Sequence, residues 1–438
     1  MHLSGQLLRL RIPDRGPDRS GQPGHATGGD SPADSALDRQ VPFDSHPVEL
    51  VPGQIWIQDG RIESVTWGQT SKDADLGGDD CVIMPGLVDA HLHLPQFDVI
   101  GAHGTTLLRW LNESVFPAES LWSAPEYAAA MTERVIRQLH GVGTTAIAAY
   151  ATVHHQGTMA ALRTAQRMGV KGVIGQVLMD RDAPETWLKD SDRQIETAAA
   201  TLDAFPPGSA LSAAVTPRFA VACSMDLLQR AGALAKQTRA IVQTHLAETV
   251  AECDLVSQRF DGLDYASVYD QAGLLHPRSI LGHGIHLDEN QRRRLADRGA
   301  HIAHCPTANS FLRSGVMNLE TLIESGVSVG LGSDIGAGYE RSMVRVARAM
   351  IEAAASIGRR FPTAAQAWWQ ITHGNARLIG MPRGERLSPG RPADLIIVRP
   401  DDDWHSRLAD PLAGLMFGWD DRWVRQTIVD GRIVHSSR

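Results

Sequence analysis

The segment Pro85-Gly86-Leu87-Val88-Asp89-Ala90-His91-Leu92-His93 decides how the rest of the chain is interpreted. It lies in a mostly apolar run, 83–93, that is typical of a buried strand and ends in two histidines separated by one residue. Residues i and i+2 of a strand point to the same face, so both imidazoles would reach one metal ion from one rigid element. Taken alone, such a pair is weak evidence for a metal site, because two surface histidines are the more common explanation.

Seven further runs rich in β-branched residues or glycine follow, and helix-like stretches separate them. Helical patterns include Met131–His140, Met159–Met168, Met225–Thr238 and Glu289–Asp297. Eight strand–helix alternations predict an α/β fold, a (β/α)8 TIM-type barrel, with a doubly wound open sheet as the competing architecture. We expect the barrel strands at 83–93, 144–152, 171–179, 211–219, 240–248, 279–285, 301–306 and 327–335.

Both ends of the chain carry short strands and the same turn chemistry. Asp59-Gly60 and Asp430-Gly431 are strong hairpin-turn signals, and each is followed by Arg-Ile. They predict one small β-sandwich domain built from both termini, with two unrelated surface hairpins as the alternative. The strands expected there are 7–12, 54–58, 61–65, 394–398, 426–429 and 432–434.

These patterns divide the chain into three parts. Residues 1–80 form the N-terminal part of the sheet domain, 81–386 the metal-dependent catalytic barrel, and 387–438 the C-terminal part of the sheet domain. Within the first part, 13–47 is rich in Gly, Pro, Asp and Ser and lacks apolar periodicity. Such a segment buries too little surface to offset the entropy of ordering, which predicts a mobile loop.

Candidate metal ligands and proton carriers fall at the ends of four of the expected strands. The carboxyl ends of barrel strands form one face, where active sites of this fold lie. Chance placement of four such ends is improbable, so we expect a metal site there. The ends carry His91 and His93 (first strand), His245 and Glu248 (fifth), His283 (sixth) and Asp334 (eighth).

The fourth strand bears on the number of metal ions. A binuclear hydrolase of this fold usually needs a bridging carboxylated lysine there, but this strand ends in Thr216-Pro217-Arg218-Phe219. A single metal ion with one position open for water is therefore favoured.

Composition excludes several other classes. The formal net charge of −8 over 438 residues gives no footprint for nucleic acid, and the short run Arg292-Arg293-Arg294 is typical of a solvated helix face. No stretch approaches the roughly 20 apolar residues of a membrane span, and no signal peptide is recognisable. We expect a cytoplasmic protein with no membrane partner. Its four scattered cysteines are then buried, reduced thiols.

Several motifs, taken together, resemble the guanine deaminase family of the amidohydrolase superfamily, in its mononuclear zinc branch, over nearly the whole chain. Specific among them are the opening P-G-x-x-D-x-H-x-H-x-x-Q and the later T-P-R-F element. The others are 107–111, Phe116-Pro117-Ala118-Glu119, 150–154, 179–184, His304-Cys305-Pro306-Thr307-Ala308-Asn309, Gly332-Ser333-Asp334 and Gly418-Trp419-Asp420-Asp421-Arg422.

The resemblance implies hydrolytic deamination of guanine to xanthine and ammonia by a zinc-activated water. It implies one Zn²⁺ per chain, a small purine substrate, and a homodimer as an open possibility. It assigns His91, His93, His245 and Asp334 to the metal, Gln96, Arg218, Phe219, Glu248 and Asp334 to the purine, and Glu248, His283 and Asp334 to catalysis.

Each role has an alternative. Glu248 would carry a proton to N3 as water attacks C2, but it would also favour the dipole of the following helix. The Arg218 fork suits a planar ligand with acceptors, or else a structural ion pair. Gln96 would read a purine edge, and Phe219 would stack on the ring or simply pack in the core.

Rival functions stay open at this point. One is a related enzyme acting on a pterin, an adenosine derivative or a triazine, and Ser310, where an apolar residue is expected, leaves room for it. The other is a catalytically dead binding or scaffold barrel, which should have lost at least one metal ligand.

Overall fold

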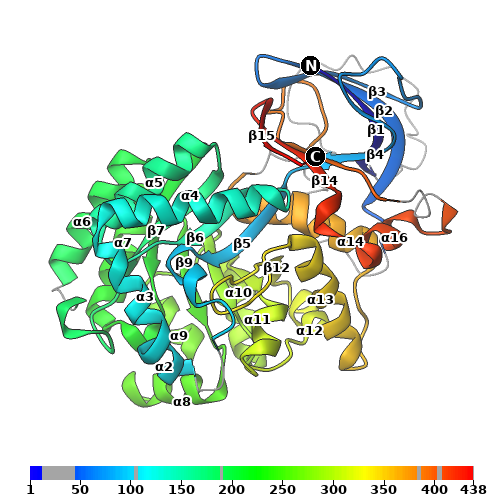
Figure 1. Cartoon of the computed structure of the whole chain (residues 1–438). Helices are drawn as coiled ribbons and strands as arrows, with labels where there is room; N and C mark the ends of the chain where they lie inside the picture. The colour runs from blue at the N-terminus through cyan, green and yellow to red at the C-terminus, as the bar shows by residue number, and fades with distance from the viewer. Residues whose placement is uncertain (12–44, 103–106, 188–190, 382–385, 402–406, 438) are drawn as a thin grey trace, which may run out of the picture.

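The computed structural model describes the chain except residues 12–44, 103–106, 188–190, 382–385, 402–406 and 438. Figure 1 shows a large barrel and a smaller sheet above it, which contains both termini. The 13–47 loop prediction falls almost entirely outside the described residues. The division at 80/81 and 386/387 stays a prediction, and strand β4 spans its first boundary.

The barrel consists of eight parallel strands whose spatial order follows the sequence, β5 to β12. This order confirms the predicted (β/α)8 barrel, because a doubly wound sheet would reverse its strand order. The strands are β5 (Leu87–His93), β6 (Thr144–Tyr150), β7 (Lys171–Leu178), β8 (Leu211–Pro217), β9 (Val242–Leu246), β10 (Ser279–His283), β11 (His301–His304) and β12 (Ser328–Leu331).

Helices cover the outside of the barrel, as the two views show. All four predicted helical stretches are helical. The helices around the barrel are α4 (Pro125–Gly141), α5 (His155–Met168), α6 (Ser191–Ala204), α7 (Met225–Thr238), α8 (Val250–Arg259), α9 (Tyr265–Gln271), α10 (Glu289–Arg298), α11 (Pro306–Phe311), α12 (Leu319–Glu324), α13 (Met343–Ser356), α14 (Ala364–Trp369) and α15 (Asn375–Leu378).

A side chain helps to close the barrel between its first and last strands. The amide nitrogen of Asn375 donates to the carbonyl oxygens of Val88 and Leu331, at 2.6 and 2.7 Å, while its oxygen accepts from Leu331 N. Farther along the seam, Asp334 N donates to His91 O at 2.8 Å. The fold thereby fixes the spacing between β5 and the segment after β12.

The terminal sheet has seven strands in the order β15-β14-β13-β4-β1-β2-β3. It curls so that the two predicted Asp-Gly turns meet, and a Cβ on Gly431 would lie 2.9 Å from Cα of Gly60. Both glycines have positive φ, as such tight hairpins require. The strands are β1 (His2–Leu10), β2 (Val48–Gln58), β3 (Arg61–Trp67), β4 (Leu76–Pro85), β13 (Leu395–Val398), β14 (Val424–Val429) and β15 (Arg432–Ser436).

A buried lysine joins the terminal sheet to the barrel. Lys171 begins β7, and its Nζ lies 2.6 Å from carboxylate oxygens of both Asp394 and Asp430. Burial acts against its charge, but the two carboxylates hold the pKa of Lys171 above its ordinary value. The terminal sheet therefore covers the amino end of the barrel, which leaves the carboxyl end free for a site.

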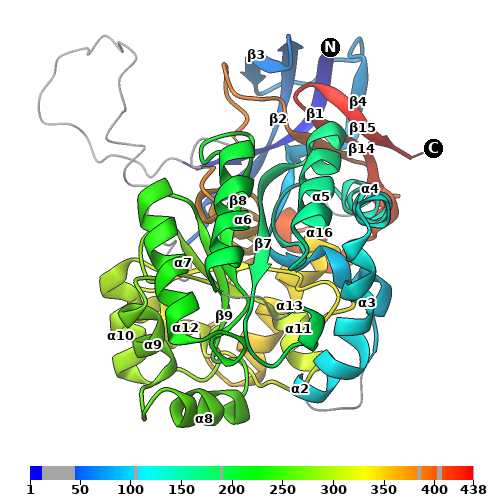
Figure 2. The same cartoon turned by 90° about the vertical axis from the view of Figure 1, so that its left-hand side faces the viewer.

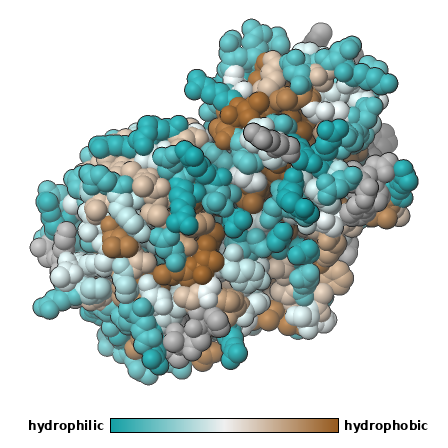
Figure 3. All heavy atoms as spheres, viewed as in Figure 1, coloured by the Kyte–Doolittle hydropathy of each residue, from teal (hydrophilic) through white to brown (hydrophobic). Residues whose placement is uncertain are grey.

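The surface gives no sign of a membrane span. Among the described residues, no helix combines the length and apolar character needed to cross a bilayer. On the face seen in Figure 3, hydrophilic residues alternate with small apolar patches on both the barrel and the sheet.

Candidate active site

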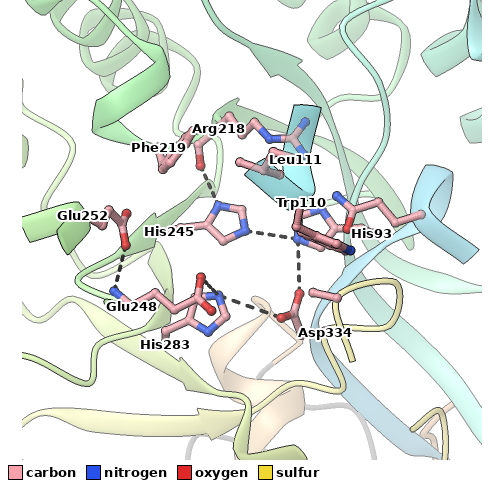
Figure 4. Close-up of a pocket in the computed structure, with 12 residues that line it drawn as sticks. His93, Trp110, Leu111, Arg218, Phe219, His245, Glu248, Glu252, His283 and Asp334 are labelled. Atoms are coloured by element: carbon pink, nitrogen blue, oxygen red, sulfur yellow. Dashed lines mark hydrogen bonds and ion pairs between the residues drawn. The ribbon is translucent and has the colours of Figure 1, made fainter. Parts of the chain in front are cut away.

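Five of the predicted site residues converge at the carboxyl end of the barrel. His91 and His93 project from alternate positions of β5, His245 lies in β9, His283 ends β10, and Asp334 follows β12. All are buried except His245, which is partly exposed. Figure 4 shows the labelled imidazoles and the Asp334 carboxylate facing a common space.

Distances among the four predicted ligands fit one metal ion. Nε2 of His93 lies 3.1 Å from Nε2 of His245, and Oδ1 of Asp334 lies 3.4 and 3.3 Å from Nε2 of His91 and His93. Ligands about 2.0–2.1 Å from a tetrahedral zinc are roughly 3.3 Å apart. His91 Nε2 and both Asp334 carboxylate oxygens also lack a hydrogen-bond partner among the described residues, which fits side chains that coordinate a metal ion.

The cluster has the protonation state that metal ligands need. Burial lowers the pKa of His91 to about 4, and burial with the neighbouring histidines lowers that of His245. Burial opposes ionisation of Asp334, but contacts with His91 and His93 hold its pKa well below the usual range. Nδ1 of His245 lies 2.6 Å from Arg218 O, a donor contact that turns Nε2 toward the cluster.

Cys305 lies beside this cluster. Its Sγ, a His91 nitrogen and an Asp334 oxygen are within 4.8 Å of one another. Burial raises the pKa of the thiol, so it stays protonated and unreactive. All four cysteines are free; Cys81, Cys223 and Cys305 are buried as expected, but Cys253 is partly exposed.

The backbone around the cluster is unusually tight. His283 and Asp334 have φ values of 71° and 50°, a left-handed conformation that costs free energy for residues with a Cβ. A Cβ on Gly282 would lie 2.7 Å from the His91 ring, and one on Gly332 would lie 2.5 Å from His91 Cβ. Only glycine at these two positions lets the neighbouring strands enclose His91.

His283 lies between the cluster and the predicted proton carrier. Its Nε2 is 3.5 Å from Glu248 and 3.9 Å from Asp334, and its Nδ1 contacts Asn309 Oδ1 at 2.9 Å. Burial acts to lower the pKa of His283, but Glu248 and Asp334 raise it overall. A nitrogen of His283 is also within metal-ligand reach of His91 and His245.

Glu248 faces the cavity rather than capping the following helix. Thr249 caps α8 in a capping box with Glu252, whose Oε2 also accepts from Glu248 N at 3.1 Å. The Glu248 carboxylate accepts from the hydroxyl of Ser314 at 2.7 Å. Burial and the charge of Glu248 raise the pKa of Glu252 to about 7. The contacts therefore favour the predicted proton carrier over the helix-dipole alternative.

Arg218 and Gln96 share a partner that the sequence interpretation missed. Glu119 makes two hydrogen bonds with Arg218, at 2.8 and 3.0 Å, and accepts one from Gln96 at 3.1 Å. All three side chains are buried. Arg218 thus forms the ion pair that was its alternative role, and it also lines the cavity. Phe219 lies in the same wall of the cavity. Glu119 stands in the quoted F-P-A-E motif, yet no spacing signal marked it as a site residue.

One cavity contains nearly all of these groups. Ser310 is exposed and is not among its described lining residues, so the sequence reservation about it loses its basis. Trp110, Leu111, Glu252 and Ala337 line the cavity without having been predicted. The complete lining is His93, Gln96, Trp110, Leu111, Arg218, Phe219, His245, Glu248, Glu252, His283, Asp334 and Ala337.

A (β/α)8 barrel with histidines and an aspartate at the ends of its first, fifth, sixth and eighth strands defines a class of metal-dependent hydrolases. Residues 82–434 match the amidohydrolase family, and the chain belongs to that family.

Within the family, the chain is similar to guanine deaminases. It is 34% identical over 366 residues to guanine deaminase of Escherichia coli, covering 81% of this chain and 83% of that protein. It is 32% identical over 378 residues to a probable guanine deaminase of Schizosaccharomyces pombe, covering 80% and 71% of the two chains. The solved E. coli guanine deaminase superimposes with a TM-score of 0.85 at 28% identity, covering 100% of both chains.

Proposed function

We propose that the protein deaminates guanine hydrolytically, giving xanthine and ammonia, with one zinc ion held by His91, His93, His245 and Asp334. The observation that carries the proposal is a cavity that brings His93, His245 and Asp334 together with Glu248 and with the Arg218–Gln96 wall. The similarity to guanine deaminases supports the choice of substrate.

Zinc, when bound, supplies a Lewis acid that lowers the pKa of a water molecule to around 7. Asp334, ionised at neutral pH, accepts a proton from that water. Glu248 holds a proton at its carboxyl group and delivers it to N3 of the ring as the water attacks C2. The proton that Asp334 has accepted passes to the amine, which leaves as ammonia. The proton of the new C2 hydroxyl returns to Glu248 as the carbonyl of xanthine forms, which helps the amine to leave. His283 lies next to Glu248 and Asp334 and stabilises their charge.

Substrate orientation falls to the remaining side chains. Arg218 donates to the carbonyl at C6, Gln96 fixes the ring edge, and Phe219 closes the wall behind the ring. Together they exclude water and turn C2 toward the metal cluster.

The direct test is ammonia release from guanine, adenine and isoxanthopterin by purified protein with its metal content measured. We expect guanine to be preferred and one zinc per chain. Faster turnover of adenine or of the pterin would favour the related-substrate alternative. Two metal equivalents in active enzyme would overturn the mononuclear site. No turnover of any ring would favour a scaffold role, which the complete ligand set argues against.

We further propose that the substrate is a free purine rather than nucleic acid. We also propose that the protein is cytoplasmic and forms a homodimer. Light scattering on purified protein checks the last of these.

A further inference from the structure

Glu119 holds both polar side chains of the substrate wall. It lies in α3 (Phe116–Ser120) and is 1% exposed. Its Oε2 accepts from Nη1 of Arg218, and its Oε1 accepts from both Nη2 of Arg218 and Nε2 of Gln96. One buried carboxylate thus joins the residue that follows β8 to the segment that follows β5.

This contact fixes which end of the Gln96 amide is available to a ligand. An ionised carboxylate only accepts hydrogen bonds, so the amide must turn its NH₂ group toward Glu119. Oε1 of Gln96 is buried and has no hydrogen-bond partner among the described residues, and Gln96 lines the cavity. Arg218 carries only donors, and each terminal nitrogen keeps a second hydrogen after pairing with Glu119. The wall therefore presents a donor beside an acceptor.

The barrel places Gln96 opposite Glu248, and Glu119 holds the guanidinium of Arg218 beside Gln96, although Arg218 follows β8, the strand next to β9. Gln96 follows β5, the first strand, and Glu248 follows β9, the fifth of eight. The first and fifth members of a ring of eight face each other. If Glu248 serves N3 of guanine, the edge facing Gln96 and Arg218 is N1–H with C6=O. That edge carries a donor beside an acceptor and complements the wall.

We propose that Glu119 is a specificity-determining positioning residue, which fixes the polarity of Gln96 and Arg218 so that the cavity selects rings with a lactam edge, C(=O)–NH. It rejects rings with the reversed amidine edge, C(NH₂)=N. The inference rests on the proposed function. A pterin carries the same lactam edge beside its 2-amino carbon, so this contact separates guanine from 6-aminopurines and not from pterins.

The test compares guanine with 2,6-diaminopurine, which keeps the amine at C2 but reverses donor and acceptor at C6 and N1. In Glu119→Gln, kcat/KM for guanine should fall about ten- to a hundredfold, the range for one charged hydrogen bond. The kcat/KM for diaminopurine should stay within a few-fold of the parent value or rise. The ratio of kcat/KM for guanine to that for diaminopurine should therefore fall. Inhibition constants give the same ratio if diaminopurine turnover is too slow to follow.

An equal loss for both purines would show a merely structural role and overturn the inference, as would an unchanged ratio. A parent enzyme that releases no ammonia from guanine would instead refute the proposed function. Glu113→Gln is the matched control, because Glu113 is an exposed carboxylate nearby that pairs with Arg109 at 2.6 Å. Glu113→Gln should leave kcat/KM unchanged for both guanine and diaminopurine.

A second variant guards against misfolding of Glu119→Gln. Gln96→Met removes the acceptor and leaves the Arg218–Glu119 pair intact, so it should also lose guanine preference. A folded Gln96→Met protein with normal metal content and an unchanged ratio would overturn the inference.

Discussion

The two ends of the barrel both bury ionisable side chains, but they treat them in opposite ways. At the amino end, Lys171 is paired with Asp394 and Asp430 from the terminal sheet. At the carboxyl end, His91 Nε2 and both Asp334 oxygens lack hydrogen-bond partners among the described residues. Burying a polar group without a partner costs free energy, so such a cluster is kept for a partner from outside. Of these two clusters, the paired one joins the terminal sheet to the barrel, and the one without hydrogen-bond partners belongs to the candidate site.

The largest effect should come from Glu248, the proposed proton carrier at the carboxyl end of the barrel. Glu248→Gln keeps the shape of the side chain but cannot carry a proton, so kcat should fall by about 10²–10⁴. Metal content and the melting temperature should stay near those of the parent. Turnover of guanine within a few-fold of the parent would show that another group moves the proton.

Breaking the cluster of Lys171, Asp394 and Asp430 at the amino end of the barrel should lower stability but leave activity unchanged. Lys171→Met leaves Asp394 buried without its cation, and loss of one partner of a buried pair costs about 3–5 kcal/mol. Denaturant unfolding measures the loss, while kcat/KM of the folded fraction should be unchanged. Lys171→Met/Asp394→Asn should recover part of the stability. A large loss of kcat/KM without destabilisation would contradict the division between the two ends.

Arg218 shares features of both ends, since it is paired with Glu119 yet lines the cavity. Arg218→Met should lower kcat/KM for guanine about ten- to a hundredfold through loss of a charged hydrogen bond. Arg218→Lys keeps the charge without the fork geometry, so its kcat/KM should lie between those of the parent and of Arg218→Met. Steady-state kinetics at matched metal content measure these losses. If Arg218→Met kept the parental kcat/KM, the Arg218–Glu119 pair would have a purely structural role.

His140, a buried histidine near the terminal sheet, should make the free energy of unfolding depend on pH. Burial lowers the pKa of His140 from 6.5 to about 4. Between these values the unfolded chain binds the proton and the folded chain does not, so stability falls as pH falls from 6.5 to 4. His140→Gln should make this slope shallower by up to about 1.4 kcal/mol per pH unit. Unfolding curves at several pH values measure it, and parallel slopes would contradict the assignment.

The smallest effect should follow deletion of residues 15–44. The flanking strands β1 and β2 already pair, and Arg11 N donates to Pro47 O at 2.8 Å, so a short turn suffices. Ser45 is retained because its carbonyl accepts from Thr363. Closing a shorter loop changes stability little, and kcat/KM should stay within about twofold. A folded but inactive variant would show that the segment reaches the site.

The sequence predicted the barrel strands and the ligand cluster because both follow from local rules. Strand periodicity placed His91 and His93 on one face, and barrel topology brought the other strand ends to them. Glu119, Ser314 and Trp110 could not be found this way. Trp110 and Glu119 lie in short helices between β5 and α4, and Ser314 lies in the loop after α11. The position of these connecting segments depends on tertiary packing rather than on a repeating pattern.

The seam between β5 and β12 has a consequence for how the candidate ligands would hold a metal ion. His91 and His93 stand on one side of the seam and Asp334 on the other, and Asn375 bridges the two strands. An ion bound by all three residues acts as a staple across the closure. Ligand binding that requires the closed state stabilises it by mass action. Chelation should therefore loosen the barrel first at this seam, and metal occupancy and barrel closure form one linked equilibrium.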